Sequence, residues 1–145
     1  MALLKAARTA QYPLMAEFTF NFDDTMVNTS AASDGFATVA SHIFDVINLP
    51  MYAVVVGGDV VTETAVTGST AYNVSVGDSA SAARYLSATD RVAAGRTALV
   101  PTGYVGAGEN IRLTVAPTVA TATAGKVTLR VMYTIRNRAQ EIQPV

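Results

Sequence analysis

Hydrophobic and polar residues alternate with a two-residue period in the last third of the chain. From Lys126 to Ile135 the odd positions carry apolar side chains, whereas the even positions are mostly polar. Successive side chains of a strand point to opposite faces of a sheet, so this pattern predicts a strand with one buried and one solvent-facing side. No long stretch of the chain keeps a helical period, and we therefore expect an all-β protein.

Alternating segments and β-branched runs predict further strands along the chain. The expected strands are 16–22, 38–49, 52–66, 72–76, 82–86, 97–100 and 111–115. Gly57 and Gly58 interrupt one of these runs and predict a bulge or bend at which the strand changes sheets. Residues 23–35 and 118–125 are expected to form loops. About seven to nine strands with closely spaced turns indicate a jelly-roll-like two-sheet β-sandwich rather than an immunoglobulin-like domain.

The sandwich is expected to be one domain over residues 14–136, between an N-terminal arm at 1–13 and a C-terminal arm at 137–145. A domain of this size buries about 70% of its unfolded surface, so it needs no disulfide or metal to form a core. We expect no membrane contact, because no apolar run approaches the ~18–20 residues that span a bilayer. The first residues lack the continuous apolar core of a secretory signal.

Charge is scarce and segregated by sign. Only 14% of residues are charged, against about 25% in a typical domain, which favours a surface covered by another copy or another protein over a bare Thr/Ser-rich surface. The segment 9–83 has eight acids and no Lys or Arg, whereas 84–145 has eight bases. The two halves either orient like subunits around a ring or interleave within one sandwich and cancel. The sequence has no cluster of basic residues, so we expect no binding to nucleic acid.

The residues that support catalysis or metal binding are nearly absent. The chain has no cysteine and one histidine, His42. Its neighbour Ser41 points to the opposite face of the expected strand, so a satisfied strand histidine is favoured over a catalytic base. Asp23, Asp24 and Asp34 lack the spacing of a calcium loop and are expected to be turn-forming acids. We predict no catalytic residue, no metal and no cofactor, and hence not an enzyme.

Two further patterns have a structural interpretation. The glycine-rich segment 103–110 resembles a phosphate loop, but a strand follows it where that loop needs a helix, so a turn is favoured. The chain has no Trp, and its tyrosines mostly fall in apolar registers, which favours packing in the core or in an interface over sugar binding. These are Tyr52, Tyr72, Tyr85, Tyr104 and Tyr133. Paired carboxylates for glycoside cleavage stay open, because sequence does not show their separation in space.

Several short strings resemble a known family. They are Phe44–Pro50, Val54–Gly58, Val74–Ser79, Arg84–Leu86 and Gly106–Leu113. The chain is similar over most of residues 14–136 to small structural proteins of tailed bacteriophages, and it resembles capsid decoration (cement) proteins with a jelly-roll body. This resemblance implies a virion protein on the outer surface of the capsid. It also implies a homotrimer at local three-fold positions that bridges major capsid protein subunits.

The arms are the expected contact elements of such a protein. We expect Leu3, Leu4 and Tyr12 to dock onto the capsid or a neighbouring subunit, and the alternative is a disordered arm. In the same setting, the chain could instead be a neck or tail-fibre component. A carbohydrate-binding β-sandwich module is the alternative from a different functional class.

Overall fold

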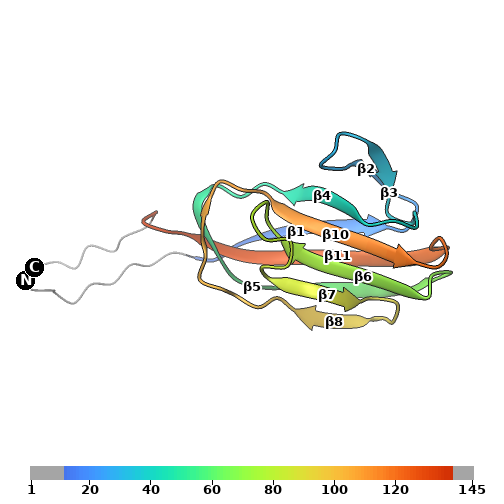
Figure 1. Ribbon diagram of the computed structural model, residues 1–145. Coiled ribbons are helices and arrows are strands. Elements are labelled where there is room, and N and C mark those ends of the chain that lie inside the picture. Colours follow the sequence, from blue (N-terminus) through green and yellow to red (C-terminus); the bar gives the residue numbers. More distant parts are fainter. Residues whose placement is uncertain (1–11, 139–145) are drawn as a thin grey trace, which may run out of the picture.

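The computed structural model describes residues 12–138, and every regular element among them is a β-strand (Figure 1). No helix in this part of the chain is long and apolar enough to cross a membrane. The strands are β1 (Leu14–Asn21), β2 (Thr25–Val27), β3 (Ser33–Gly35), β4 (His42–Ile47), β5 (Met51–Thr67), β6 (Ala71–Gly77), β7 (Leu86–Asp90), β8 (Gly95–Ala98), β9 (Val105–Ala107), β10 (Ile111–Thr118) and β11 (Ala124–Ile135).

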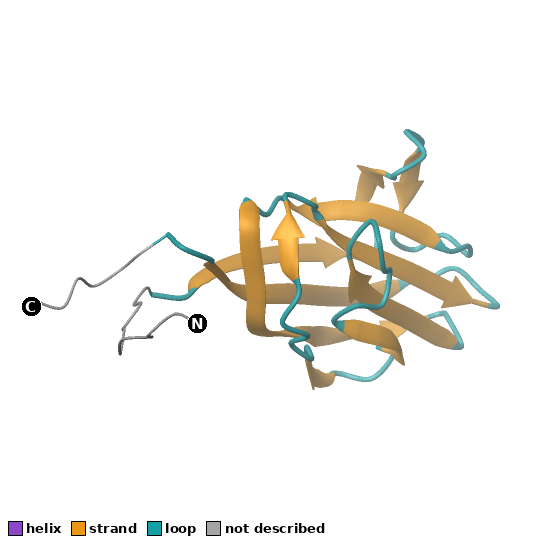
Figure 2. Cartoon of the chain, turned by 60° about the vertical axis from the view of Figure 1, so that its left-hand side comes forward, coloured by secondary structure: helices purple, strands orange, loops and turns teal. Residues whose placement is uncertain are grey.

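Nine of these strands form two packed antiparallel sheets (Figure 2). One sheet has the order β1-β11-β5-β8, with β9 also paired to β5, and the other has the order β4-β10-β6-β7. If the short β9 is left out, only β6 and β7 are consecutive within one sheet, and every other connection crosses between the sheets. Two four-stranded sheets joined in this way form a jelly roll. The predicted all-β, jelly-roll-like sandwich is confirmed.

The alternating segment at the end of the chain forms β11, as predicted. Val127, Leu129 and Val131 are at most 1% exposed and face the core. Along β1, Phe18 pairs with Leu129 and Phe20 pairs with Val127. The two-residue period therefore places the apolar side chains of both strands on the inner face of one sheet.

An aromatic cluster joins the two sheets. Phe36, in the connection between β3 and β4, stacks on Phe20 of β1 with ring centroids 4.2 Å apart. It also lies 4.5 Å from the ring of Phe44 on β4. The hydroxyl of Tyr72 on β6 donates a hydrogen bond to the Phe36 carbonyl at 2.8 Å. Burial of Tyr72 raises the pKa of this hydroxyl, which stays protonated as the donor.

The segment 23–35 is not a simple loop, contrary to the prediction. It contains the hairpin β2–β3, which stands apart from the two layers in Figures 1 and 2. The turn of this hairpin is held by Asn28, whose side-chain oxygen accepts hydrogen bonds from the amides of Ser30 and Ala32. Three-residue strands are too short to show a period, and their polar residues favour a turn in sequence.

Of the expected strand 82–86, residues 82–85 form a turn, and β7 begins only at Leu86. The carboxylate of Asp78 accepts hydrogen bonds from the amides of Ala80 and Ser81, both at 2.9 Å. This local bonding fixes a turn directly after β6 and delays the next strand. The actual number of strands in the described part, eleven, also exceeds the expected number because β2, β3 and β9 are only three residues long.

The glycine pair in β5 produces the expected bulge but no change of sheet. The register between β5 and β11 shifts at Met132–Tyr133, opposite the step from Gly57 to Val55. On both sides of this bulge, β5 stays paired with β11. The partner on the other edge of β5 changes instead, from β9 near Met51 to β8 near Asp59.

The segregated charges of the sequence interleave in the fold. Five ion pairs among the described residues each join an acid of the first half to a base of the second half, so the two signs of charge cancel within one sandwich. They are Asp45–Arg112, Asp59–Arg96, Asp59–Arg130, Glu63–Lys126 and Asp78–Arg84. Burial raises the pKa of Asp59, but hydrogen bonds from Arg130 and Arg96 outweigh this effect and hold the pKa below its usual range. Pairing of distant strands forms all of these ion pairs except Asp78–Arg84, which lies within the connection between β6 and β7.

Candidate functional site

His42 fastens the β2–β3 hairpin to the sandwich. Its Nδ1 lies 2.9 Å from Oδ2 of Asp34 on β3, and its side chain is 12% exposed. The other ring nitrogen, Nε2, is buried without a hydrogen-bond partner, so the expected fully satisfied histidine is only half correct. The contact joins β3 to β4, and it gives this imidazole a structural role.

The expected turn role is confirmed for Asp24, whereas Asp34 lies in strand β3. Asp24 accepts a hydrogen bond from the backbone amide of Asn21 at 2.7 Å. Asp34 is bonded to Asn28 and His42. Across residues 12–138, no group of three or more His, Asp or Glu side chains is arranged to hold a metal ion.

The glycine-rich segment forms a turn and the short strand β9, and β10 follows it. The strand expected after this segment, in place of the helix of a phosphate loop, is thus confirmed, while the expected turn is replaced in part by β9. Tyr72 and Tyr85 are buried in the core, and burial raises the pKa of Tyr85 to about 12. Tyr52 differs, since 55% of its surface is exposed.

A network of polar side chains lies at one end of the sandwich. We call the end at which β1 begins and β11 ends the terminal end, where Leu14 pairs with Tyr133 (Figure 1). The opposite end is the distal end. Three connections meet at the terminal end: residues 48–50, 78–85 and 99–110. The connections 48–50 and 99–110 run between the two sheets, and 78–85 joins the neighbouring strands β6 and β7. Together they form the surface of the terminal end.

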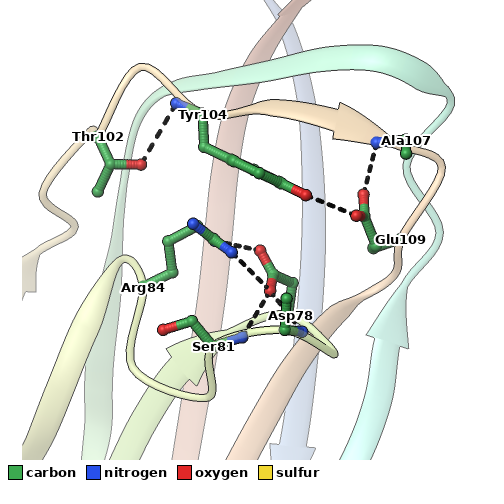
Figure 3. Close-up of polar contacts among 8 residues, drawn as sticks. Asp78, Ser81, Arg84, Thr102, Tyr104, Ala107 and Glu109 are labelled. Atoms are coloured by element: carbon green, nitrogen blue, oxygen red, sulfur yellow. Dashed lines mark hydrogen bonds and ion pairs between the residues drawn. The ribbon is translucent and has the colours of Figure 1, made fainter.

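A hydrogen-bonded network fixes two of these connections to each other (Figure 3). Arg84 forms an ion pair with Asp78, and its guanidinium carbon lies 3.7 Å from the centre of the Tyr104 ring. The Tyr104 hydroxyl donates to Oε1 of Glu109 at 2.6 Å. Oε2 of Glu109 accepts from the amide of Ala107, also at 2.6 Å. The network links the 78–85 turn to the 99–110 connection through one arginine stacked on one ring.

The network also sets the protonation of its acids. Burial raises the pKa of Asp78, but hydrogen bonds from Arg84 and from the amides of Ser81 and Ala80 outweigh this effect and lower the pKa. The pKa of Glu109 is lowered by the hydrogen bond from Tyr104 and by backbone amides. Both carboxylates therefore remain ionised well into the acid range.

We expect Asp78→Asn to destabilise the domain by about 2 kcal/mol, because it removes a charged hydrogen-bond acceptor for Arg84 at a site that is 4% exposed. The unfolded chain binds a proton at Asp78 near the ordinary value of 3.8, whereas the folded chain binds it only at lower pH. Wild-type stability should therefore fall as the pH drops below about 4, and this fall should be smaller in D78N. Thermal unfolding between pH 2.5 and pH 7 measures it, and identical pH profiles would contradict it.

Exposed apolar side chains gather in the half of the sandwich nearest the terminal end. Among residues 12–138, six of the nine large exposed hydrophobic residues belong to it: Tyr12, Met15, Met51, Tyr52, Val56 and Val100. Of the contact residues expected from sequence, Tyr12 is 93% exposed here, while Leu3 and Leu4 lie outside the described residues. Tyr52 was expected to pack in the core or in an interface, whereas no sequence pattern singled out Met51, although Pro50 marks the corner before both residues.

The outer face of the β1-β11-β5-β8 sheet is divided into two bands. Towards the terminal end, Met15 pairs with Met132, which pairs with Gly57, so this row is uncharged. In the next outward-facing row, Glu17 pairs with Arg130, which pairs with Asp59. The apolar band is thus bordered by charge on one side, as is common for interaction surfaces.

Comparison with known proteins identifies the fold. No protein-family model matches the chain, and no curated protein matches its sequence. A chain in the capsid asymmetric unit of cyanophage Pam1 is similar at a TM-score of 0.61 and 23% identity, over 92% of this chain and 94% of that one. A chain in the acidic stable capsid structure of Helicobacter pylori bacteriophage KHP30 gives 0.65 and 17%, over 97% and 100%.

A third similar structure is the capsid of Ralstonia phage GP4, with a TM-score of 0.57 and 15% identity over 98% of this chain and 93% of the matched chain. Coverage is nearly complete on both sides in all three comparisons, so the matched chains are about as long as this one. The protein therefore shares its whole jelly-roll fold with chains of similar length in three phage capsid structures.

Proposed function

We propose that this protein is a non-catalytic structural component of a bacteriophage virion that decorates and stabilises the capsid. The observation that carries the proposal is the end-to-end match in fold to chains of three phage capsid structures. The similarity in fold alone does not assign a function, but it agrees with the resemblance of the sequence strings to decoration proteins.

The surface chemistry supports a binding role rather than a reaction. The terminal end combines exposed apolar side chains with a fixed polar network, which is the composition of a docking surface. The one histidine is used to hold a hairpin, and the Asp34 carboxylate beside it is part of the same contact. These features favour a protein that acts by binding other proteins rather than by catalysing a reaction.

The finer assignment follows from the resemblance and is part of the same proposal. The domain lies on the outer surface of the capsid as a homotrimer and bridges subunits of the major capsid protein. The arms at 1–13 and 137–145 reach from the terminal end to neighbours, with Leu3, Leu4 and Tyr12 as contact residues. Tyr12, at 93% exposure, is free to make such a contact.

Copy number in purified virions tests the proposed function. Quantitative mass spectrometry should find the chain in near-stoichiometric amounts relative to the major capsid protein. A few copies per virion would instead indicate a neck or tail-fibre component. Absence from virions would overturn the proposal, and binding on a glycan array would then point to a carbohydrate-binding module.

Deleting residues 1–12 should leave the domain folded but weaken its attachment to capsids, because Leu3, Leu4 and Tyr12 are removed while the core is untouched. Co-sedimentation of the truncated protein with capsids from a phage lacking the gene measures the attachment. Circular dichroism checks that the β-fold is kept. Unchanged binding would show that the sandwich alone carries the contact.

A further inference from the structure

Tyr52 has an unusual backbone conformation on the surface. Its φ is 63°, in the left-handed region that bulky residues rarely adopt because of steric strain. The residue lies at the start of β5, directly after the 48–50 connection at the terminal end. Such strain persists only where the surrounding structure imposes it, and it is concentrated at functional positions.

The surrounding backbone holds this corner on both sides. The amide of Arg136 donates to the Tyr52 carbonyl at 2.9 Å, and the amide of Ala53 donates to the Pro50 carbonyl at 3.2 Å. Next to Tyr52, Met51 pairs with Ala107 of β9. The chain is thus fixed where it is strained, while the side chains of Met51 and Tyr52 are 56% and 55% exposed.

The charges around Met51 and Tyr52 indicate the charge of a partner that would bind there. At the terminal end, the carboxylate of Asp78 is neutralised by Arg84, and that of Glu109 is occupied by Tyr104. Arg136 and Arg138, just after β11, are exposed. The distal end has the opposite character, since it carries Asp23, Asp24, Asp34 and Asp90 beside the base Arg91, while Glu63 and Lys126 there neutralise each other in an ion pair.

We propose that the Met51–Tyr52 corner is the anchor by which this domain docks end-on, with the Tyr52 ring inserted into an apolar recess of an acidic protein surface. This inference rests on the proposed function, in which that surface belongs to the capsid. Rigid exposed Tyr side chains lose little entropy on binding and often dominate the affinity of an interface. Arg136 and Arg138 complement the acidic rim, and the acidic distal end faces away from the partner.

The chain offers a matched control for the test. Val119, in the distal connection between β10 and β11, also has a positive φ, 72°, and is 81% exposed. Tyr52→Gly and Val119→Gly therefore remove a side chain at a similarly strained exposed position, one at each end. Tyr52→Asn is a second variant, because Asn tolerates the left-handed conformation and keeps the chain less flexible than Gly.

The full-length variants are titrated onto capsids purified from a phage that lacks the gene. We expect Tyr52→Gly and Tyr52→Asn to bind more weakly by about tenfold or more, while Val119→Gly binds like the wild type. Raised salt should weaken wild-type binding. Light scattering and thermal unfolding confirm that oligomeric state and folding are unchanged.

Each other outcome has a distinct meaning. If wild-type protein binds and the Tyr52 variants bind equally well, the anchor is wrong and the proposed function stands. If the Tyr52 variants lose their oligomeric state, the corner contacts a second copy instead, which also overturns end-on docking to the capsid. If wild-type protein itself does not bind capsids, the proposed function fails and this inference fails with it.

Discussion

Replacing Phe36 with alanine is expected to cost about 3–5 kcal/mol of unfolding free energy, the usual loss for a buried phenylalanine. The side chain is 2% exposed and packs between Phe20 of one sheet and Phe44 of the other. Its removal leaves a cavity at the point where the two sheets meet. Since domains of this size are stable by about 5–15 kcal/mol, this single change would remove a large share of the total.

Urea denaturation monitored by circular dichroism measures this loss. Val39→Ala is the matched control, because Val39 lies in the same connection between β3 and β4 but is 44% exposed. We expect the control to change stability by less than about 0.5 kcal/mol. A loss below about 1 kcal/mol in F36A would contradict the central role of the ring.

Gly58→Ala is the second substitution with a large expected effect, about 3 kcal/mol or more, from backbone strain together with overpacking. Gly58 has a φ of 137°, where a side chain is strained, and an added Cβ would overlap the carbonyl oxygen of Arg130 on β11. The Gly58 carbonyl also accepts a hydrogen bond from the amide of Leu99 at 3.0 Å. The substitution would therefore push β5 away from strands on both of its edges.

The neighbouring glycine provides the control for this prediction. At Gly57, an added Cβ would meet only the terminal methyl of Met132, at 3.2 Å, and this flexible side chain can move. We expect Gly57→Ala to change stability by no more than about 1 kcal/mol. Equal losses in G57A and G58A, measured by the same denaturation, would show that the bulge itself, rather than the backbone at Gly58, requires glycine.

The strands that are long and half-buried could be predicted from sequence because their burial imposes a two-residue period. β1, β6, β10 and β11 are the clearest cases, since each alternates between the core and a more polar face. β7 was displaced because the side chain of Asp78 captures backbone amides after β6, a local competition that the period does not reveal.

The candidate docking surface was predictable only in part. Tyr12 was expected to be a contact residue, and its exposure at the terminal end agrees with a contact role without testing it. Tyr52 is one of the tyrosines whose apolar registers predict packing in the core or in an interface, and it is 55% exposed in this structure. Its exposure follows from the left-handed corner after Pro50, and no pattern of residue types specifies that dihedral angle.

The sequence by itself determined the fold class, because strand periodicity and turn spacing are local properties. Burial of one face of a strand requires an apolar residue at every second position, and this pattern is visible in the sequence. Tertiary structure decided what depends on contacts between distant residues. The partner of each charge is one example: Asp59 meets Arg130 across 71 positions only because β5 pairs with β11 in one register. The position of Phe36 between the sheets and the gathering of Met15, Met51 and Tyr52 at one end depend on the same pairing, which the order of residues does not specify.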